Sequence, residues 1–189
     1  MTWSLIVTRT ILLTCAIALM GASPGATSYT NTTYKHETLV VPSNSPVRLV
    51  GFGKYGTARF SGQFRLVGRF TYGCAVDCGG PVKDAYFRFD IVPDATLAAR
   101  LPHYPGHKQD IMVVVTSNSK LVRAMTSSRQ RASLRSDLRS AVTGRIEILV
   151  DQLEISLDCD SANYSASFVA LAHTPEFAQV DLDGDYGCG

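Results

Sequence analysis

The stretch TARFSGQFRLVGRFTYG, residues 57–73, alternates apolar or glycine positions with polar ones. A period of two predicts one amphipathic β-strand, and only Val67 interrupts it. Fully extended, the stretch would reach roughly 55 Å, far beyond a usual strand of about five or six residues, so we expect it to bend. Gly62 and Gly68 lie on the apolar face, where a missing side chain lets a strand coil over a core. The predicted core face comprises Phe60, Gly62, Phe64, Leu66, Gly68, Phe70 and Tyr72.

Several other segments are also typical of β-strands. Residues 85–91 alternate clearly and are expected to pair with the first strand, and the apolar, mostly β-branched run 111–115 predicts a buried central strand. Between Ile146 and Leu157 the apolar parity slips by one residue near Asp151-Gln152, which predicts a β-bulge. Shorter strands are predicted over residues 47–50, 164–172 and 177–182.

Two segments carry helix signals. Asp94 is a suitable N-cap for a short helix through Leu97 to Arg100. Ser127 and Gln130 form a capping-box pattern, and behind them apolar residues recur every four positions up to Gly144. The apolar positions of this second helix are Leu134, Leu138 and Val142, and another face carries a stripe of Arg131, Arg135 and Arg139.

These elements predict a mainly β, α+β domain: a single curled antiparallel sheet or small OB-like barrel of six to eight strands, with one short helix and one basic amphipathic helix. The OB-like assignment is an analogy of fold and carries no function with it.

Residues 1–26 are predicted to be a secretory signal peptide, because Arg9 precedes an apolar run from Ile11 to Met20. The run is too short to span a bilayer, so an uncleaved anchor is disfavoured, and a lipoprotein site at Cys15 is a weaker alternative. We therefore expect a secreted or periplasmic protein without a transmembrane span after signal removal. Residues 27–46 are polar and are predicted to be a flexible arm, and residues 47–189 a single β-rich domain.

The mature chain has an even number of cysteines, which in an exported protein predicts disulfides. Three connectivities are possible. If the last three strands form a meander, the first and third run the same way and their ends meet, which favours Cys159 with Cys188 and leaves Cys74 with Cys78. A four-thiolate zinc site is the alternative, although only Cys74 and Cys78 are close in sequence.

Charge is strongly segregated along the chain. Residues 120–145 hold seven basic residues and one acid, whereas residues 146–189 hold nine acids and no Lys or Arg. Such halves often pair within one fold, and less often one of them awaits an external partner. The arginine stripe can grip an anionic ligand, but pairing within the molecule or with solvent is the stronger interpretation.

No catalytic constellation is complete, and we expect no cofactor. The stretch Gly51-Phe-Gly53-Lys-Tyr-Gly56 matches the spacing G-x-G-x-x-G, but a strand follows instead of a helix, so a hairpin turn is predicted. His103 and His107, with Asp110 nearby, can form a metal site or be two exposed loop histidines. Asp181, Asp183 and Asp185 resemble an incomplete calcium loop or a solvated strand face.

The sequence therefore favours a non-enzymatic, exported binding or interaction protein. It would engage an anionic ligand or a protein partner through the barrel surface and the basic helix, with Arg131, Arg135 and Arg139 as candidate ligand residues. The alternatives are a metal-dependent hydrolase centred on His103 and His107, and an inhibitor of an extracytoplasmic enzyme using the loop 73–81. Nucleic acid is not an expected partner. Asn31-Thr-Thr and Asn163-Tyr-Ser fit the glycosylation pattern, which matters only in a eukaryotic secretory pathway.

Overall fold

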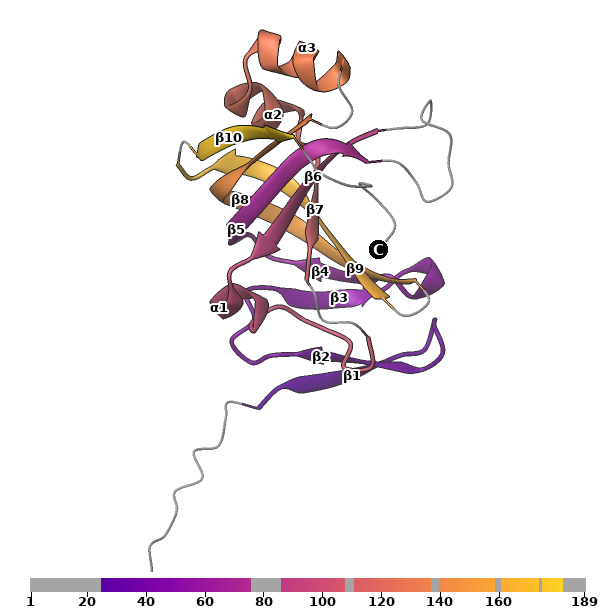
Figure 1. The fold of residues 1–189 in the computed structure, drawn as a ribbon. Coiled ribbons are helices and arrows are strands. Elements are labelled where there is room, and N and C mark those ends of the chain that lie inside the picture. Colours follow the sequence, from indigo (N-terminus) through magenta and orange to yellow (C-terminus); the bar gives the residue numbers. More distant parts are fainter. Residues whose placement is uncertain are drawn as a thin grey trace, which may run out of the picture.

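The computed structural model describes residues 25–75, 86–107, 111–136, 140–158, 161–173 and 175–181. Figure 1 shows a β-rich body with α2 and α3 at one end and the β1–β2 hairpin at the other. The elements in order are β1 (Thr27–Asn31), β2 (Glu37–Val41), β3 (Arg48–Phe52), the 3-10 turn η1 (Lys54–Gly56), β4 (Ala58–Ser61), β5 (Phe64–Ala75), β6 (Tyr86–Pro93), α1 (Ala95–Ala98), β7 (Val113–Thr116), α2 (Ser119–Met125), α3 (Ser128–Ser136), β8 (Ser140–Asp158), β9 (Ser161–Leu171) and β10 (Glu176–Asp181). None of the described helices is long and apolar enough to cross a membrane.

The main sheet closes on itself. Strand β5 pairs with β6, β6 with β7, β7 with β9, β9 with β8, and β8 again with β5, so these strands form a ring. All of these pairings are antiparallel except that of β7 with β9. Closure leaves the ring without an open edge, and β3, β4 and β10 extend the same sheet beyond it. The mainly β fold with a curled sheet, predicted from the sequence, is confirmed.

The predicted long strand is one path with a bend. It divides into β4 and β5 at Gly62, whose φ of 117° is in the region that favours glycine. Both halves pair with β8: Arg59 lies opposite Glu154, and Phe64 opposite Val150. Strand β8 bends at the same level, because Gln152 has a φ of 50° and the β8–β9 register shifts between Asp151 and Glu154. The predicted bend and the predicted bulge are both confirmed.

The core lies inside this bent sheet. The rings of Phe70 and Phe89 stack with centroids 5.2 Å apart, joining β5 to β6. On β8 the inward-facing apolar side chains before and after the bulge are all buried, because the extra residue restores the inward face after the bend. Full burial of each such side chain stabilises the fold by about 1.5–3 kcal/mol. The predicted strand face contributes Phe60, Phe64, Leu66 and Phe70 to the core, and β8 contributes Ile146, Ile148, Val150, Leu153, Ile155 and Leu157.

The flexible arm predicted over residues 27–46 is wrong. Its ends form the antiparallel hairpin β1–β2, whose register runs from Thr27 opposite Val41 to Asn31 opposite Glu37. Leu39 is fully buried, and Val40 exchanges two backbone hydrogen bonds with His103, at 2.8 and 3.0 Å. The polar composition was misleading because a hairpin that packs one face on a barrel needs few apolar residues.

The helix predicted from Ser127 to Gly144 is shorter than expected. The capping box is confirmed: Ser127 N donates to Gln130 Oε1 at 2.8 Å, and Gln130 N donates to Ser127 Oγ at 3.2 Å. Helix α3 ends at Ser136, however, and Val142 lies on β8 between Tyr72 and Gln179, so pairing on both sides of the strand overrides the helical period. Helix α2, with buried Leu121, Val122 and Met125, was not predicted.

The predicted meander of the last three strands is also wrong. Strand β10 runs antiparallel to β8, with Asp181 opposite Ser140, and so continues along the same side of β8 as β9. The ends of β8 and β10 therefore do not meet, and the geometric argument for a Cys159–Cys188 bridge no longer holds. Cys74 is buried, whereas Cys78, Cys159 and Cys188 lie outside the described residues, as does the predicted signal segment up to Pro24. The disulfides and the signal peptide stay predictions.

Gly68 lies at a close approach of β5 to β6, and it gives a direct test of the closed barrel. A Cβ at Gly68 would lie 2.1 Å from the carbonyl oxygen of Val92. Gly68→Ala should lower the free energy of unfolding by about 3 kcal/mol, because the backbones must separate. Gly106→Ala is the matched control, since nothing lies within 4 Å of its added methyl group. Equal urea midpoints for the two variants would contradict this packing.

A buried ion pair on β6 makes stability depend on pH. Asp90 Oδ2 accepts a hydrogen bond from Arg88 Nε at 2.8 Å, while Oδ1 is buried and has no hydrogen-bond partner among the described residues. Burial raises the pKa of Asp90, and the ion pair with Arg88 only partly offsets this effect.

Because the folded protein binds this proton at a higher pH than the unfolded chain does, the charged carboxylate costs stability above the folded pKa. The unfolding free energy of the wild type, relative to Asp90→Asn, should therefore rise as the pH falls through the folded pKa. It should level off below the unfolded pKa of about 3.9. Urea unfolding at a series of pH values measures this difference, and a flat difference between the two proteins would refute it.

Candidate ligand-binding groove

The glycine-rich stretch 51–56 forms the turn between β3 and β4, as the sequence predicted. The two strands pair antiparallel, and Gly53 N donates to the carbonyl oxygen of Thr57 at 2.7 Å. The turn leads into β4, so it offers no helix N-terminus to a phosphate. It is a hairpin turn in which the amides of Gly53 and Thr57 bond within the turn and the side chains of Lys54 and Tyr55 are exposed.

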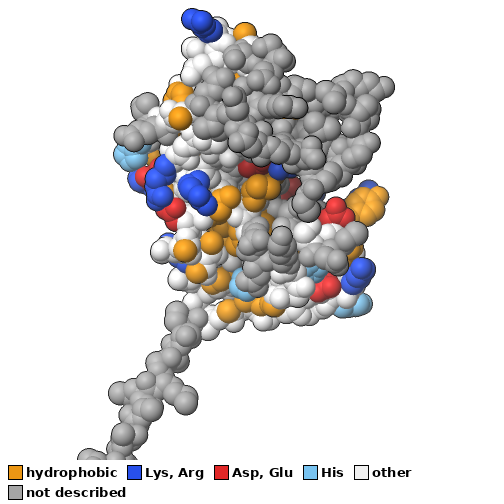
Figure 2. Space-filling view, viewed as in Figure 1, with side chains coloured by type: hydrophobic (Ala, Val, Ile, Leu, Met, Phe, Trp, Pro, Cys, Tyr) orange, Lys and Arg blue, Asp and Glu red, His pale blue; other side chains and the backbone are white. Residues whose placement is uncertain are grey.

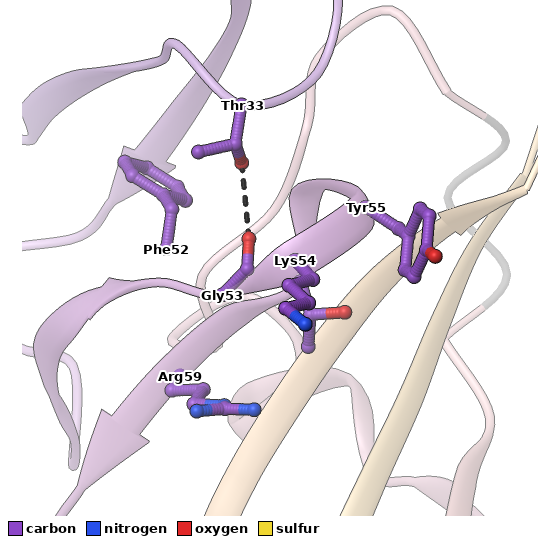
Figure 3. A pocket seen from close by; sticks show the side chains of 7 residues that line it. Thr33, Phe52, Gly53, Lys54, Tyr55 and Arg59 are labelled. Carbon is purple, nitrogen blue, oxygen red and sulfur yellow. Dashed lines mark hydrogen bonds between the residues drawn. The ribbon is translucent and has the colours of Figure 1, made fainter.

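The β1–β2 hairpin holds this turn from behind. Asn31 Nδ2 donates to the carbonyl oxygen of Gly56 at 2.7 Å and to Tyr104 Oη at 3.0 Å, and Asn31 is fully buried. Thr33 Oγ1 shares its single hydrogen between Asn31 Oδ1, at 2.8 Å, and the carbonyl oxygen of Gly53, at 3.2 Å, and Figure 3 draws the second of these contacts. Gly56 has a φ of 77° and packs so closely on Tyr34 that a Cβ would lie 2.3 Å from the Cβ of that tyrosine. Two turn carbonyls are thus fixed by one hairpin, and Asn31 cannot carry a glycan in the folded protein.

Tyr104 and Tyr164 support the same region from the barrel side. Burial raises the pKa of Tyr104, the bond from Asn31 lowers it and Glu37 raises it. Burial also raises the pKa of Tyr164, whose hydroxyl donates to the carbonyl oxygen of Pro102 at 3.0 Å. Both phenols remain protonated at neutral pH, so they act as uncharged hydrogen-bonding supports.

Tyr55 is the unusual residue of the turn. Its backbone has φ 56° and ψ 29°, a left-handed conformation that costs a non-glycine residue about 1–2 kcal/mol. Its side chain is 85% exposed, so packing does not compensate for this strain. Backbone strain that is not offset by side-chain packing is often found at functional positions.

Cations accompany this exposed ring. Lys54 is exposed, and Arg59 Nε lies 3.2 Å from Glu154 Oε1. The guanidinium of Arg59 lies over Gly53, where an added Cβ would be 3.2 Å from Cζ. Figure 3 shows Phe52 and Tyr55 on opposite sides of the turn, with Lys54 and Arg59 between them. The surface here is a shallow groove of about 720 Å³, lined by Thr33, Phe52, Gly53, Lys54, Tyr55, Thr57 and Arg59.

The groove combines two cations, one of them already paired, with an exposed aromatic ring. Lys54 has no ion pair with any residue in the described ranges. An ammonium group attracts carboxylate, sulfate or phosphate, and a tyrosine ring offers a flat apolar face with a polar end. This arrangement is suited to binding and positioning a ligand. Within the part of the chain that the structure describes, we find no nucleophile paired with a base here.

Of the arginine stripe predicted on the helix, only the side chain of Arg131 lies among the described residues. Arg131 is half-buried and bonds to its own chain: its guanidinium donates to the carbonyl oxygen of Thr126, and to Ser128 Oγ at 3.1 Å. The first of these bonds gives a hydrogen-bond partner to the carbonyl oxygen of Thr126, the C-cap residue of α2. The side chain of Arg135 and the whole of Arg139 lie outside the described residues, so their proposed ligand role is untested. The acids after the helix pair instead with β4 and β5, as Arg59 with Glu154 and Arg65 with Glu147.

The predicted metal sites gain no support from the described residues. His107 is buried, its Nε2 lies 3.6 Å from Glu37 Oε1, and its Nδ1 has no hydrogen-bond partner. His103 Nδ1 lies 3.4 Å from the carbonyl oxygen of Leu101. No group of three His, Cys, Asp or Glu side chains converges in the described ranges. Asp110, Asp183 and Asp185 lie outside those ranges, as does most of the predicted inhibitory loop 73–81.

Sequence reasoning missed Lys54 and Tyr55 as candidate site residues. The available signal was an aromatic and a basic residue at the tip of a glycine-rich hairpin turn, which places both side chains in solvent. No sequence signal showed that Asn31 would hold the turn, because that contact joins residues 31 and 56 through the tertiary fold.

Comparisons with protein-family models, curated proteins and solved structures gave no significant match. The assignment of function therefore rests on the geometry of the groove.

Replacing the strained tyrosine should separate stability from function. Tyr55→Gly should raise the free energy of unfolding by about 1 kcal/mol, because glycine adopts the left-handed conformation without strain. Thr57→Gly is the control: Thr57 has a φ of −65°, so glycine relieves no strain there and removes both the side chain and its backbone restriction, and that variant should be less stable than the wild type. Denaturant unfolding measures both. A Tyr55→Gly protein less stable than the wild type would contradict the strain.

Proposed function

We propose that this chain is an exported, non-enzymatic binding protein that holds an anionic ligand in the groove beside the β3–β4 turn. The observation that carries the proposal is Tyr55, a strained and exposed aromatic residue beside Lys54, which has no ion pair with the residues that the structure describes. The turn that presents both side chains is fixed from behind by Asn31 and Thr33, so the site is preorganised before a ligand arrives.

Charge and shape favour an acidic sugar as the ligand. An aromatic ring stacks on the apolar face of a sugar, while Lys54 and Arg59 pair with its acid group. A polynucleotide would need a continuous basic track with several stacking side chains, whereas Glu154 stands beside this groove. Loops of OB-like barrels bind both oligosaccharides and oligonucleotides, so the analogy of fold allows a sugar ligand without selecting it.

The arginine helix takes a smaller part in this proposal than the sequence suggested. The guanidinium of Arg131 already donates hydrogen bonds to Thr126 and Ser128. The groove therefore replaces the arginine stripe as the first candidate for the ligand-binding site. The metal-hydrolase and inhibitor alternatives gain no specific observation from the described residues, and we do not pursue them.

Calorimetry with a hexamer of galacturonic acid tests the proposal. Lys54→Ala should weaken binding about tenfold, since it removes the unpaired cation. Tyr55→Gly should weaken it by a similar factor, since it removes the stacking ring while leaving the fold more stable. The methyl ester of the same hexamer, which is neutral, should bind more weakly than the acid to the wild type.

Lys120→Ala supplies the matched control, because Lys120 is exposed on α2 and its loss changes the net charge by the same amount as Lys54→Ala. The control should bind like the wild type. The proposal is overturned if the acid hexamer does not bind, or if all three variants bind it equally well.

A further inference from the structure

Strand β1 has one edge that pairs with no strand in the described part of the chain. On its other side it pairs antiparallel with β2, and these two strands form a sheet of their own. The far side of β2 is occupied, because Val40 exchanges backbone hydrogen bonds with His103 at 2.8 and 3.0 Å. Figure 1 shows β1 at the lower end of the body, with β2 between it and β3. The open edge of β1 therefore points away from the barrel.

The register of the hairpin decides which backbone groups reach this edge. In an antiparallel pair, residues that bond to the partner strand alternate with residues whose amide and carbonyl point away from it. Val40 directs both groups to His103, so its pair with Ser28 is of the second kind. Thr30, two residues further along β1, is of the same kind. The open edge thus presents the amides and carbonyls of Ser28 and Thr30, while those of Tyr29 face β2.

This edge lacks the features that usually prevent sheets from pairing with one another, which are charged residues, proline and β-bulges in the edge strand. Strand β3, at the end of the main sheet, has two of them: it begins with Arg48, and its register shifts between Leu49 and Gly51. Strand β1, with the sequence TSYTN, has no charge, no proline and an unbroken register. Figure 2 shows mainly uncharged atoms, white and orange, along the lower edge of the body where β1 lies.

The open edge is complementary to a second copy of itself. If two β1 strands run antiparallel with Tyr29 opposite Tyr29 of the other copy, Ser28 of each strand lies opposite Thr30 of the other. Each of these two pairs exchanges two backbone hydrogen bonds, so together they form four, and every amide and carbonyl of Ser28 and Thr30 gains a partner. The tyrosines have Cβ atoms about 4.5–5.5 Å apart in this arrangement, which allows their rings to touch. Tyr29 is 38% exposed, so part of its ring is free for this contact.

We propose that two copies of this chain associate through β1 and form a continuous four-stranded sheet in the order β2–β1–β1–β2. The two barrels lie on opposite sides of the contact, because each open edge points away from its own barrel. Charge does not oppose the contact, since β1 is neutral and the whole chain has a formal net charge of only +2. The inference goes beyond the ligand function proposed for the groove and does not depend on it.

The contact is small, so the dimer should be weak. A standard interface engages about 20–30 residues on each side, whereas this one is built on a strand of five residues. Association should therefore depend on protein concentration. Sedimentation equilibrium over a concentration series measures it, and the weight-average mass of the wild type should rise from that of a monomer towards that of a dimer.

Thr30→Pro should weaken dimerisation about tenfold or more, because it removes the Thr30 amide of both copies and with it two of the four hydrogen bonds. That amide points away from β2, so the hairpin itself loses no hydrogen bond. Thr38→Pro is the matched control. Thr38 is also exposed and lies directly opposite Thr30, but its amide points to the other side of β2, so this variant should dimerise like the wild type.

An exchange of charge at Tyr29 separates this register from a loss of folding. Tyr29→Lys and Tyr29→Glu should each remain monomeric, because like charges then lie directly opposite each other. An equimolar mixture of the two variants should dimerise, because opposite charges then face each other. Such a rescue requires both variants to be folded and to pair at this position.

The proposal is overturned if the wild type stays monomeric up to millimolar concentrations. It is equally overturned if Thr30→Pro dimerises as strongly as the wild type, or if the mixture of the two Tyr29 variants dimerises no more than either variant alone. The first result would leave the edge to a different partner strand, and the others would place the dimer contact elsewhere on the molecule.

Discussion

Strand β8 is the constraint on which the rest of the sheet depends. It pairs with β4 and β5 along one side and with β9 and β10 along the other. A strand of this length can pair along the whole height of a small barrel only if it bends. The bend of β8 at Gln152 lies at the level of Gly62, the bend between β4 and β5. Paired bends keep the apolar side chains of both strands facing inward, so the same two positions decide the closure of the barrel and the continuity of its core.

The function proposed here depends on a second layer built on that barrel. The β1–β2 hairpin adds Leu39 and Val41 to the barrel core, and it contributes to the groove through Asn31 and Thr33, which contact the carbonyls of the β3–β4 turn. The β3–β4 turn then holds the backbone of Tyr55 in a left-handed conformation that a non-glycine residue otherwise avoids. A chain of backbone contacts thus connects a polar N-terminal segment to the side chains of the groove. The outward arginines of β4 and β5 follow from the same alternation that forms the core.

Patterns with a short period were reliable guides to this fold. Alternation predicted the faces of β5 and β8, the parity slip predicted the bulge near Gln152, and the capping box at Ser127 and Gln130 is present. Predictions failed where tertiary pairing decides. Val142 fits a helical period but lies between β5 and β10, and the polar residues 27–46 form a hairpin because the barrel and the loop at His103 offer partners for it. The groove could not be predicted because Asn31, Gly56 and Tyr104 meet only in the folded chain.

Amide hydrogen exchange in wild type and Asn31→Ala tests most directly the central claim that the hairpin holds the groove in its binding shape. The amides of Gly53 and Thr57 form hydrogen bonds within the turn, and their protection should fall about tenfold or more in the variant. The reason is that Asn31 and Thr33 contact the carbonyl oxygens of Gly56 and Gly53 behind the turn. Amides of β5 and β8 should keep their protection. Unchanged protection at Gly53 and Thr57, or an equal loss throughout β5 and β8, would contradict the account.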